Sequence, residues 1–208
     1  MTRIISGFAG SLRLAVPPAG TRPTSDRVRE AMFSALDARG ILPGARVLDL
    51  YCGSGALGLE AASRGAAHVT LVDKAIAAHR VTNDNVARVR KAAPRGAVPD
   101  IVVSSQPVQS FLGGAQVTWD VVFLDPPYEL GGLELAHNLE ALVSRLAPEA
   151  VVVVERSARD PEPAWPEGLE LDRRKDYGDT AVYYLSAAPS AAPSAAPSAA
   201  PSTAPPTA

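Results

Sequence analysis

One stretch, LDLYCGSGALG at residues 48–58, indicates the fold. An apolar run includes Asp49, and Gly53, Gly55 and Gly58 then fit the spacing G-x-G-x-x-G. This spacing is typical of the strand, tight turn and helix that open a doubly wound α/β sheet, where glycines let the backbone approach a bound nucleotide closely. Glycine turns also serve plain strand-to-helix packing, so the flanking segments must support the interpretation.

The flanking sequence alternates between short apolar runs and amphipathic segments. Short apolar strands between helices predict a mostly parallel sheet covered by helices on both faces. In residues 169–186, two strand-like runs meet at 177–179 with no helix between them, which predicts an antiparallel C-terminal hairpin strand. We therefore expect an α/β fold with a doubly wound, Rossmann-like sheet of seven strands. The expected strands before this hairpin are 45–51, 68–73, 100–105, 119–125 and 150–155, and the expected helices are 25–38, 55–64, 75–91 and 132–146.

The 208-residue chain divides into three parts. Residues 1–20 predict a small β-hairpin arm, and residues 21–186 hold the sheet and its helices. Residues 187–208 repeat AAPS and are expected to be disordered, because they carry no charge and little to bury. A single cysteine fits a reducing compartment, and no apolar stretch resembles a signal peptide or a membrane span. We therefore expect a cytoplasmic protein, and a monomer.

Charge is distributed unevenly along the chain. The net charge of −2 and the sequence pI near 5.9 argue against a nucleic-acid-binding protein. Residues 1–30 nevertheless carry five arginines against two acids, and a second basic cluster occupies residues 80–95. This asymmetry favours a face that meets a polyanion, although ordinary solvated helix faces explain the second cluster equally well. The arginines expected to contact nucleic acid are Arg3, Arg13, Arg22, Arg27 and Arg29.

Two aspartates indicate which ligand the glycine turn binds. Asp73 ends the next strand about 20 residues after Gly53, where an acid can accept hydrogen bonds from ribose hydroxyls. Asp49 lies before the glycines, and a carboxylate there would repel the pyrophosphate of a dinucleotide. It suits a cationic ligand instead, the ammonium or sulfonium of S-adenosylmethionine. NAD is the second candidate, and a helix-capping or structural role is the alternative for Asp49.

The segment DPPY, residues 125–128, follows another apolar strand. Pro126 and Pro127 end the strand, because proline has no N–H to donate and a fixed φ. The Asp125 carboxylate and the Pro126 carbonyl would then accept the N–H groups of a planar amine and expose its lone pair for in-line attack. Tyr128 offers a stacking face for an extruded base. Alone, the segment equally fits a proline-terminated strand with an ordinary turn.

Four segments in order resemble a known family: RPTSDRVREAMF (22–33), LDLYCGSGALGLEAASRGA (48–66), VDK (72–74) and DPPY (125–128). Over roughly residues 3–186 the chain is similar to the bacterial 16S rRNA (guanine(966)-N2)-methyltransferases, which are class I S-adenosylmethionine-dependent enzymes. The glycine turn and DPPY are shared by many amino-methyltransferases. The arginine-rich segment upstream is what narrows the family.

The resemblance implies methyl transfer from S-adenosylmethionine, leaving S-adenosylhomocysteine, to N2 of a guanine in 16S rRNA of an assembled or assembling small ribosomal subunit. It implies a catalytic clamp at Asp125, Pro126, Pro127 and Tyr128. Many methyltransferases bind adenine with an acid after the third strand, and here Ser105 or Gln106 takes that place. The implied cofactor contacts are Asp49, Gly53, Ser54, Gly55 and Asp73, with Tyr51 and Lys74 as further candidates in the same motifs.

Other functions remain open at this point. A DNA methyltransferase shares the chemistry, although the chain has no room for a separate base-reading domain. A protein-glutamine methyltransferase explains everything except the arginines, and an NAD(P)-dependent oxidoreductase leaves Asp49 and the clamp unexplained. A non-catalytic RNA-binding module explains the arginines alone. No metal is expected, because the three histidines show no ligand spacing, and Cys52 is expected to pack within the cofactor turn.

Overall fold

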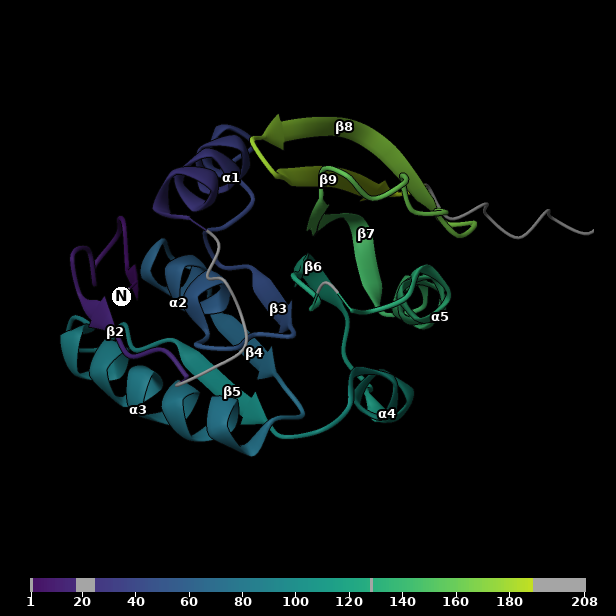
Figure 1. Ribbon diagram of the computed structural model, residues 1–208. Coiled ribbons are helices and arrows are strands. Elements are labelled where there is room, and N and C mark those ends of the chain that lie inside the picture. Colours follow the sequence, from purple (N-terminus) through teal and green to yellow (C-terminus); the bar gives the residue numbers. More distant parts are fainter. Residues whose placement is uncertain (1, 18–24, 128, 189–208) are drawn as a thin grey trace, which may run out of the picture.

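The computed structural model describes residues 2–17, 25–127 and 129–188 (Figure 1). Its centre is a seven-stranded sheet with the strand order β5-β4-β3-β6-β7-β9-β8, and a separate two-stranded sheet pairs β1 with β2. The strands are β1 Thr2–Arg3, β2 Arg13–Leu14, β3 Arg46–Leu50, β4 His68–Val72, β5 Asp100–Ser104, β6 Trp119–Leu124, β7 Leu146–Ser157, β8 Leu169–Tyr177 and β9 Thr180–Ala187. The helices are α1 Asp26–Ala38, α2 Ala56–Ser63, α3 Ile76–Ala92, α4 Val108–Gly114 and α5 Gly132–Val143.

The large sheet is parallel through five strands and antiparallel at one end. β3 pairs in parallel with both β4 and β6, and the parallel pairing continues to β5 on one side and β7 on the other. β9 lies between β7 and β8 and runs antiparallel to both. The predicted doubly wound sheet, its antiparallel C-terminal hairpin and the small N-terminal hairpin are thus confirmed. Below, the carboxyl edge is the side at which β3, β4, β5, β6 and β7 end, and the amino edge is the opposite side.

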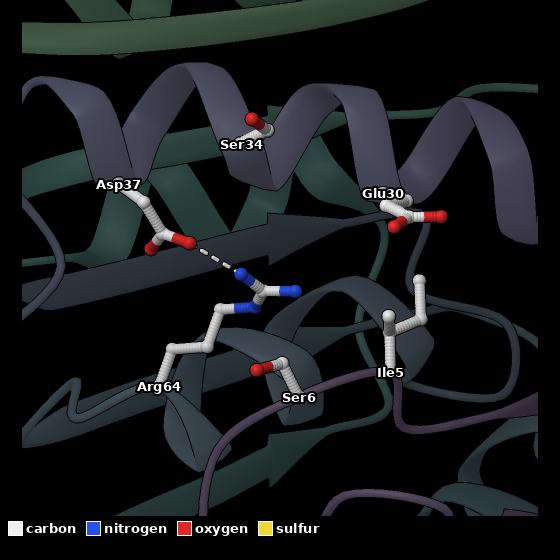
Figure 2. A pocket seen from close by; sticks show the side chains of 6 residues that line it. All are labelled: Ile5, Ser6, Glu30, Ser34, Asp37 and Arg64. Atoms are coloured by element: carbon white, nitrogen blue, oxygen red, sulfur yellow. Dashed lines mark hydrogen bonds and ion pairs between the residues drawn. The ribbon is translucent and has the colours of Figure 1, made fainter.

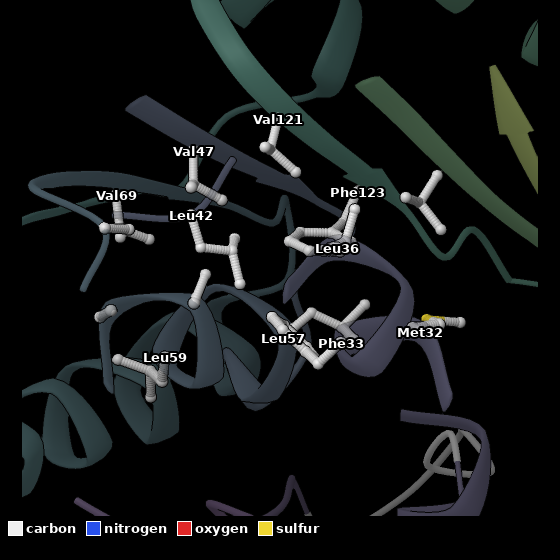
Figure 3. Close-up of a cluster of buried hydrophobic side chains, with 14 of the residues drawn as sticks. Met32, Phe33, Leu36, Leu42, Val47, Leu57, Leu59, Val69, Val121 and Phe123 are labelled. Carbon is white, nitrogen blue, oxygen red and sulfur yellow. The ribbon is translucent and has the colours of Figure 1, made fainter. Parts of the chain in front are cut away.

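Helices cover both faces of this sheet because its strands carry apolar side chains on both sides. On one face, α1, α2 and α3 pack over strand residues such as Val47, Val121 and Phe123 (Figure 1 and Figure 3). The ring of Phe33 in α1 lies 5.4 Å from the ring of Phe123. On the other face, α4 and α5 pack against a second cluster that includes Trp119. Both clusters fix the helices, and with them the loops that follow the strands.

The N-terminal segment is bound to α2 through its residues 5–9. The buried carboxylate of Glu60 accepts the backbone N–H groups of Ile5 and Ser6 at 2.6 and 3.0 Å. The Ser63 hydroxyl donates to the Ser6 carbonyl at 2.6 Å and accepts the Ala9 N–H at 2.9 Å. These bonds dock the segment onto the back of α2. The predicted boundary at residue 20 falls among residues 18–24, outside the described residues, and stays a prediction.

A hollow of about 380 Å³ lies between the N-terminal segment, α1 and α2 (Figure 2). Within it, Arg64 forms an ion pair with Asp37 of α1, and it also pairs with Glu60 at 2.7 Å. Because α2 ends at Ser63, shortly before β4 begins, this hollow lies towards the amino edge. It is separate from the strand ends that carry the predicted site.

The structure differs from the predicted elements in two places. Helix α4 was not predicted, because seven residues give too little periodicity to identify a helix. The predicted helix 132–146 ends at Val143, and β7 already begins at Leu146. Ala187 ends β9, while residues 189–208 of the predicted tail lie outside the described residues.

Among the residues that the structure describes, no helix is long and apolar enough to cross a bilayer.

Candidate functional site

The turn after β3 lies at the carboxyl edge and is shaped by left-handed backbone. Tyr51, Gly53 and Gly55 have φ values of 62, 54 and 76°. Glycine adopts this region at little cost, and a tyrosine there is uncommon. A Cβ on Gly58 would lie only 2.3 Å from a methyl carbon of Leu71. The first two glycines therefore shape the turn, and the third lets α2 pack closely against β4.

Asp49 is buried near the end of β3, and its two carboxylate oxygens differ in their hydrogen bonds. Oδ2 accepts the Gly58 N–H at 2.9 Å, whereas Oδ1 has no hydrogen-bond partner among the described residues. Burial raises the pKa of this carboxyl to about 8; the Gly58 hydrogen bond opposes the shift, and the carboxylates of Asp125 and Asp73 add to it. A buried acceptor without a donor costs free energy. Asp49 thus supports the turn and keeps capacity for a cationic ligand.

Asp73 follows β4 and directs its carboxylate at the same turn. Oδ2 accepts the Gly53 N–H at 3.0 Å, and Oδ1 accepts the Ala75 N–H at 2.8 Å. The side chain is only half-buried, and a carboxylate oxygen can accept more than one hydrogen bond. It can therefore accept hydrogen bonds from a diol while it holds the turn. Lys74, the next residue, is exposed beside it.

Two polar residues of α3 hold the glycine turn, and neither was predicted from the sequence. Thr82 Oγ1 donates to the Gly53 carbonyl at 2.8 Å, and Asn85 Nδ2 donates to the Ser54 carbonyl at 2.9 Å. The Asn85 amide also pairs with both backbone groups of Ala15, so it links the turn to the N-terminal segment. Both side chains are fully buried. Two polar residues three positions apart on the apolar face of a helix indicate buried hydrogen-bonding groups, and this pattern could have identified them.

Tyr51 extends from the turn towards α5. Its hydroxyl accepts a hydrogen bond from Asn138 at 2.6 Å, another buried residue that the sequence analysis missed. Burial, reinforced by the nearby Glu134 carboxylate, raises the pKa of Tyr51 to about 12. The phenol is therefore neutral at physiological pH. The neighbouring Cys52 is buried, and burial raises the pKa of its thiol, which fits the predicted packing role.

The predicted clamp segment lies beside the glycine turn. β3 and β6 are neighbours, and their register pairs Leu50 with Leu124, the last residue before Asp125. The Asp125 carboxylate is half-buried and lies close enough to Asp49 to raise its pKa. Two motifs more than 60 residues apart in the sequence thus meet at one point of the carboxyl edge.

Hydrogen bonds fix the far end of the clamp segment. The Leu130 N–H donates to the Pro127 carbonyl at 2.9 Å, and Pro126 is buried. Arg156 of β7 donates from Nη2 to the Leu130 carbonyl at 3.1 Å. The loop is therefore tied to the sheet on both sides of Tyr128. Tyr128 itself lies outside the described residues, and its stacking role stays a prediction.

Ser105 and Gln106 are exposed in the loop between β5 and α4, also at the carboxyl edge. The Asp73 N–H donates to the Ser104 carbonyl at 3.1 Å, so the end of β5 adjoins Asp73. The structure thus brings together the cofactor candidates at the ends of β3, β4 and β5.

Arg29 does not lie on the surface, contrary to the prediction that it contacts nucleic acid. The side chain is 1% exposed, and burial lowers the pKa of its guanidinium. Nη1 donates to Thr2 Oγ1 at 2.6 Å, while Nη2 donates to Asp26 at 2.9 Å and to the Arg3 carbonyl. Arg29 lies on the buried face of α1 with Met32 and joins the helix to β1. It cannot face a phosphate.

The other predicted RNA contacts are distributed over two elements. Arg3, Arg13 and Arg27 are exposed, and Arg22 lies outside the described residues. Arg88 of α3 donates to the Arg13 carbonyl at 3.4 Å, which brings the second basic cluster next to β2. Within the described parts of the chain, no group of three or more His, Cys, Asp or Glu side chains could hold a metal ion.

Known proteins resemble this chain along most of its length. The family model described as Conserved hypothetical protein 95 matches residues 2–186. The chain is 38% identical over 180 residues to the Ribosomal RNA small subunit methyltransferase D of Escherichia coli K12, and the match covers 86% of each protein. A solved structure of an Escherichia coli protein, 33% identical, superposes with a TM-score of 0.76 over 89% of this chain and 97% of that one.

The fold also extends to more distant methyltransferases. The magnesium protoporphyrin IX methyltransferase of Synechocystis PCC 6803, solved with bound SAM, superposes with a TM-score of 0.61 at 16% identity, over 81% of this chain and 87% of that one. A likeness at this identity shows the fold alone. Because the family model spans nearly all described residues, the chain belongs to the Conserved hypothetical protein 95 family, the family of the Ribosomal RNA small subunit methyltransferase D proteins.

Proposed function

We propose that the protein transfers the methyl group of S-adenosylmethionine to the N2 amino group of a guanine in 16S rRNA. The observation that carries this proposal is the pairing of β3 with β6, which sets the glycine turn beside the clamp segment. The Asp125 carboxylate is near enough to Asp49 to raise its pKa. A methyl donor bound in the turn would thus lie next to an amine held by the clamp.

The glycine turn fits S-adenosylmethionine. Oδ1 of Asp49 lacks a partner among the described residues and can accept a hydrogen bond from an ammonium group. A Cβ on Gly53 would meet nothing closer than 4.0 Å, so the backbone there is open to a ligand. Asp73 can accept the ribose hydroxyls, with Ser105 and Gln106 towards the adenine. When bound, the cofactor supplies an electrophilic methyl group on a sulfonium.

The clamp addresses a specific chemical difficulty. The lone pair of an exocyclic amine is conjugated with the ring, so the nitrogen is a poor nucleophile. In our proposal the target guanine is flipped out of the stack, and its two N–H groups donate to the Asp125 carboxylate and the Pro126 carbonyl. These acceptors favour a pyramidal nitrogen and direct its lone pair at the methyl carbon. Asp125 then takes the proton that the nitrogen releases, and Tyr128 stacks on the base.

The family supports an RNA acceptor. The Escherichia coli relative is named for small-subunit rRNA, and Arg3, Arg13 and Arg27 offer exposed guanidinium groups for phosphates. We propose 16S rRNA in an assembled or assembling small subunit as the partner. An adenine in DNA or a glutamine amide poses the same nitrogen chemistry. The identity of the acceptor therefore needs a direct test.

Transfer of labelled methyl from S-adenosylmethionine to four acceptors provides that test. The acceptors are small subunits lacking the modification, naked 16S rRNA, duplex DNA and a release factor. We expect N2-methylguanosine in the rRNA and no comparable label in the DNA or the release factor. Label in adenine or in glutamine would overturn the substrate. Failure to bind S-adenosylhomocysteine, with binding of NAD instead, would overturn the cofactor.

A further inference from the structure

A second hollow lies at the carboxyl edge, between the start of α1 and the turn that joins β8 to β9. The register pairs Ser157, the last residue of β7, with Thr180, so this turn lies at the edge where β7 ends. Figure 1 shows α1 next to the same turn. Only β7 separates β9 from β6, which ends at the clamp. Asp176 and Tyr177 of β8 line the hollow, and β8 is the third strand from β6, so about three strand spacings, roughly 14 Å across the sheet, separate these residues from the proposed methylation site.

The walls of this hollow combine three kinds of side chain. The hollow has a volume of about 340 Å³. Its lining includes the exposed guanidinium of Arg27 and the carboxylate of Asp176, which forms an ion pair with Arg174 at 2.9 Å. Tyr177 is half-buried and packs against the core under α1, which restrains its ring. A Cβ on Gly178 would meet nothing within 4 Å, so the space beside the tyrosine is open. The remaining lining residues are Ser25 and Val28.

We propose that this hollow holds a nucleotide that flanks the target base, with its base on Tyr177 and its phosphate at Arg27. An aromatic ring and a guanidinium beside one another are the elements with which proteins bind single-stranded RNA. The Asp176 carboxylate adds an acceptor for a base N–H, as in the recognition of exocyclic amino groups. The volume falls within the range of small-ligand pockets. The proposal rests on the proposed function, because it places the nucleotide relative to the clamp.

Kinetics with small subunits that lack the modification test the hollow. Tyr177→Ala should raise the KM for subunits roughly 5- to 100-fold through the loss of stacking, and Arg27→Gln should raise it several-fold. In both variants kcat and the affinity for S-adenosylhomocysteine should stay within about twofold of wild type, because the cofactor turn is untouched. Tyr177→Phe keeps the ring and should resemble wild type. Arg46→Gln, an exposed arginine at the amino edge, is the matched control.

A binding measurement with a short single-stranded rRNA fragment completes the test. Weaker fragment binding by Tyr177→Ala and by Arg27→Gln, with Arg46→Gln unchanged, would support the proposal. An unchanged KM in Arg27→Gln, whose exposed side chain poses no risk to folding, would overturn it. Loss of subunit binding with full fragment binding would also overturn it, because the occupant would then be a ribosomal protein. Fragment binding needs no methyl transfer, so it reports on the hollow even if the proposed function fails.

Discussion

The glycine turn and the first turn of α1 both depend on charged side chains, but the two sets differ in where their hydrogen bonds go. In the glycine turn, Asp49 and Asp73 bind backbone N–H groups and still offer acceptor capacity towards the carboxyl edge. In α1, Arg29 gives its hydrogen bonds to Thr2, Asp26 and the Arg3 carbonyl. Arg27, two residues away, is in solvent. Asp49 and Arg29 are both buried, and each keeps one polar atom without a partner among the described residues, so location separates them: only Asp49 adjoins the glycine turn at the carboxyl edge.

The largest expected effect concerns Asp125, which lies at the edge shared with Asp49. If its carboxylate holds the target amine in the transition state, Asp125→Ala should lower kcat roughly a hundred- to a thousandfold, about 2.7–4 kcal/mol, by analogy with oxyanion-hole deletions. Binding of S-adenosylhomocysteine should persist. Asp120→Ala is the matched control, because Asp120 lies near the start of β6, the strand that Asp125 follows, and accepts the Arg46 N–H at 2.7 Å. Near-normal turnover of the Asp125→Ala variant would contradict the clamp mechanism.

Arg29 and Arg27 form a pair that tests the contrast within one helix. Arg29→Ala leaves the buried Thr2 hydroxyl and the partly buried Arg3 carbonyl without their donor, so we expect the free energy of unfolding to fall by about 2–4 kcal/mol. Arg27→Ala should change it by no more than about 0.5 kcal/mol, because that side chain is exposed. Urea denaturation of both variants provides the measurement. Equal losses would mean that Arg27 is also structural.

Asp49 should make cofactor binding depend on pH. Burial raises its pKa to about 8 in the folded protein from the usual 3.8, so its contribution to stability is fully present below about pH 4 and is lost as pH rises to 8. An ammonium at Oδ1 favours the carboxylate, so binding releases a proton from Asp49 below pH 8. We therefore expect the affinity for S-adenosylhomocysteine to rise with pH up to about 8.

Asp49→Asn is the variant that tests this linkage. An asparagine can keep the hydrogen bond to the Gly58 N–H but has no charge, so the affinity for S-adenosylhomocysteine should fall roughly 10- to 100-fold at pH 8. The pH dependence of binding should disappear with it. Calorimetric titration between pH 5 and 8 measures both. A variant that retains the wild-type pH profile would show that another group supplies the proton.

The parts of the site that depend on local backbone geometry could be predicted from the sequence. Gly53 and Gly55 have the left-handed φ values that their spacing indicated, and Asp73 reaches the turn from the end of the next strand. The alternation of strands and helices likewise predicted the parallel sheet. Once that sheet is assumed, the clamp segment must end at the same edge as the glycine turn. Chain order and strand direction were sufficient for these conclusions.

Contacts that depend on how a helix is rotated could not be predicted. Thr82 and Asn85 reach the turn because α3 directs that face inward, and Asn138 reaches Tyr51 from α5. Arg29 looked like a surface arginine because nothing in the sequence shows that β1 lies against α1. Polar residues on an apolar helical face indicate burial, but their partners follow only from packing. The burial of Arg29 could not be foreseen for this reason.

The smallest expected effect is on salt dependence, at the junction of the two basic clusters. Arg13 and Arg88 are both exposed, and Arg88 donates to the Arg13 carbonyl at 3.4 Å, so one phosphate-binding surface can include both. Each of Arg13→Gln and Arg88→Gln should lower the log–log slope of RNA affinity against salt by about 0.7–0.9 for a lost phosphate contact. Thermal stability should hardly change, and Arg46→Gln should leave the slope intact. If the double variant keeps the full slope, the exposed face of α3 is an ordinary solvated face, and the phosphates must lie along Arg3 of β1 and Arg27 of α1.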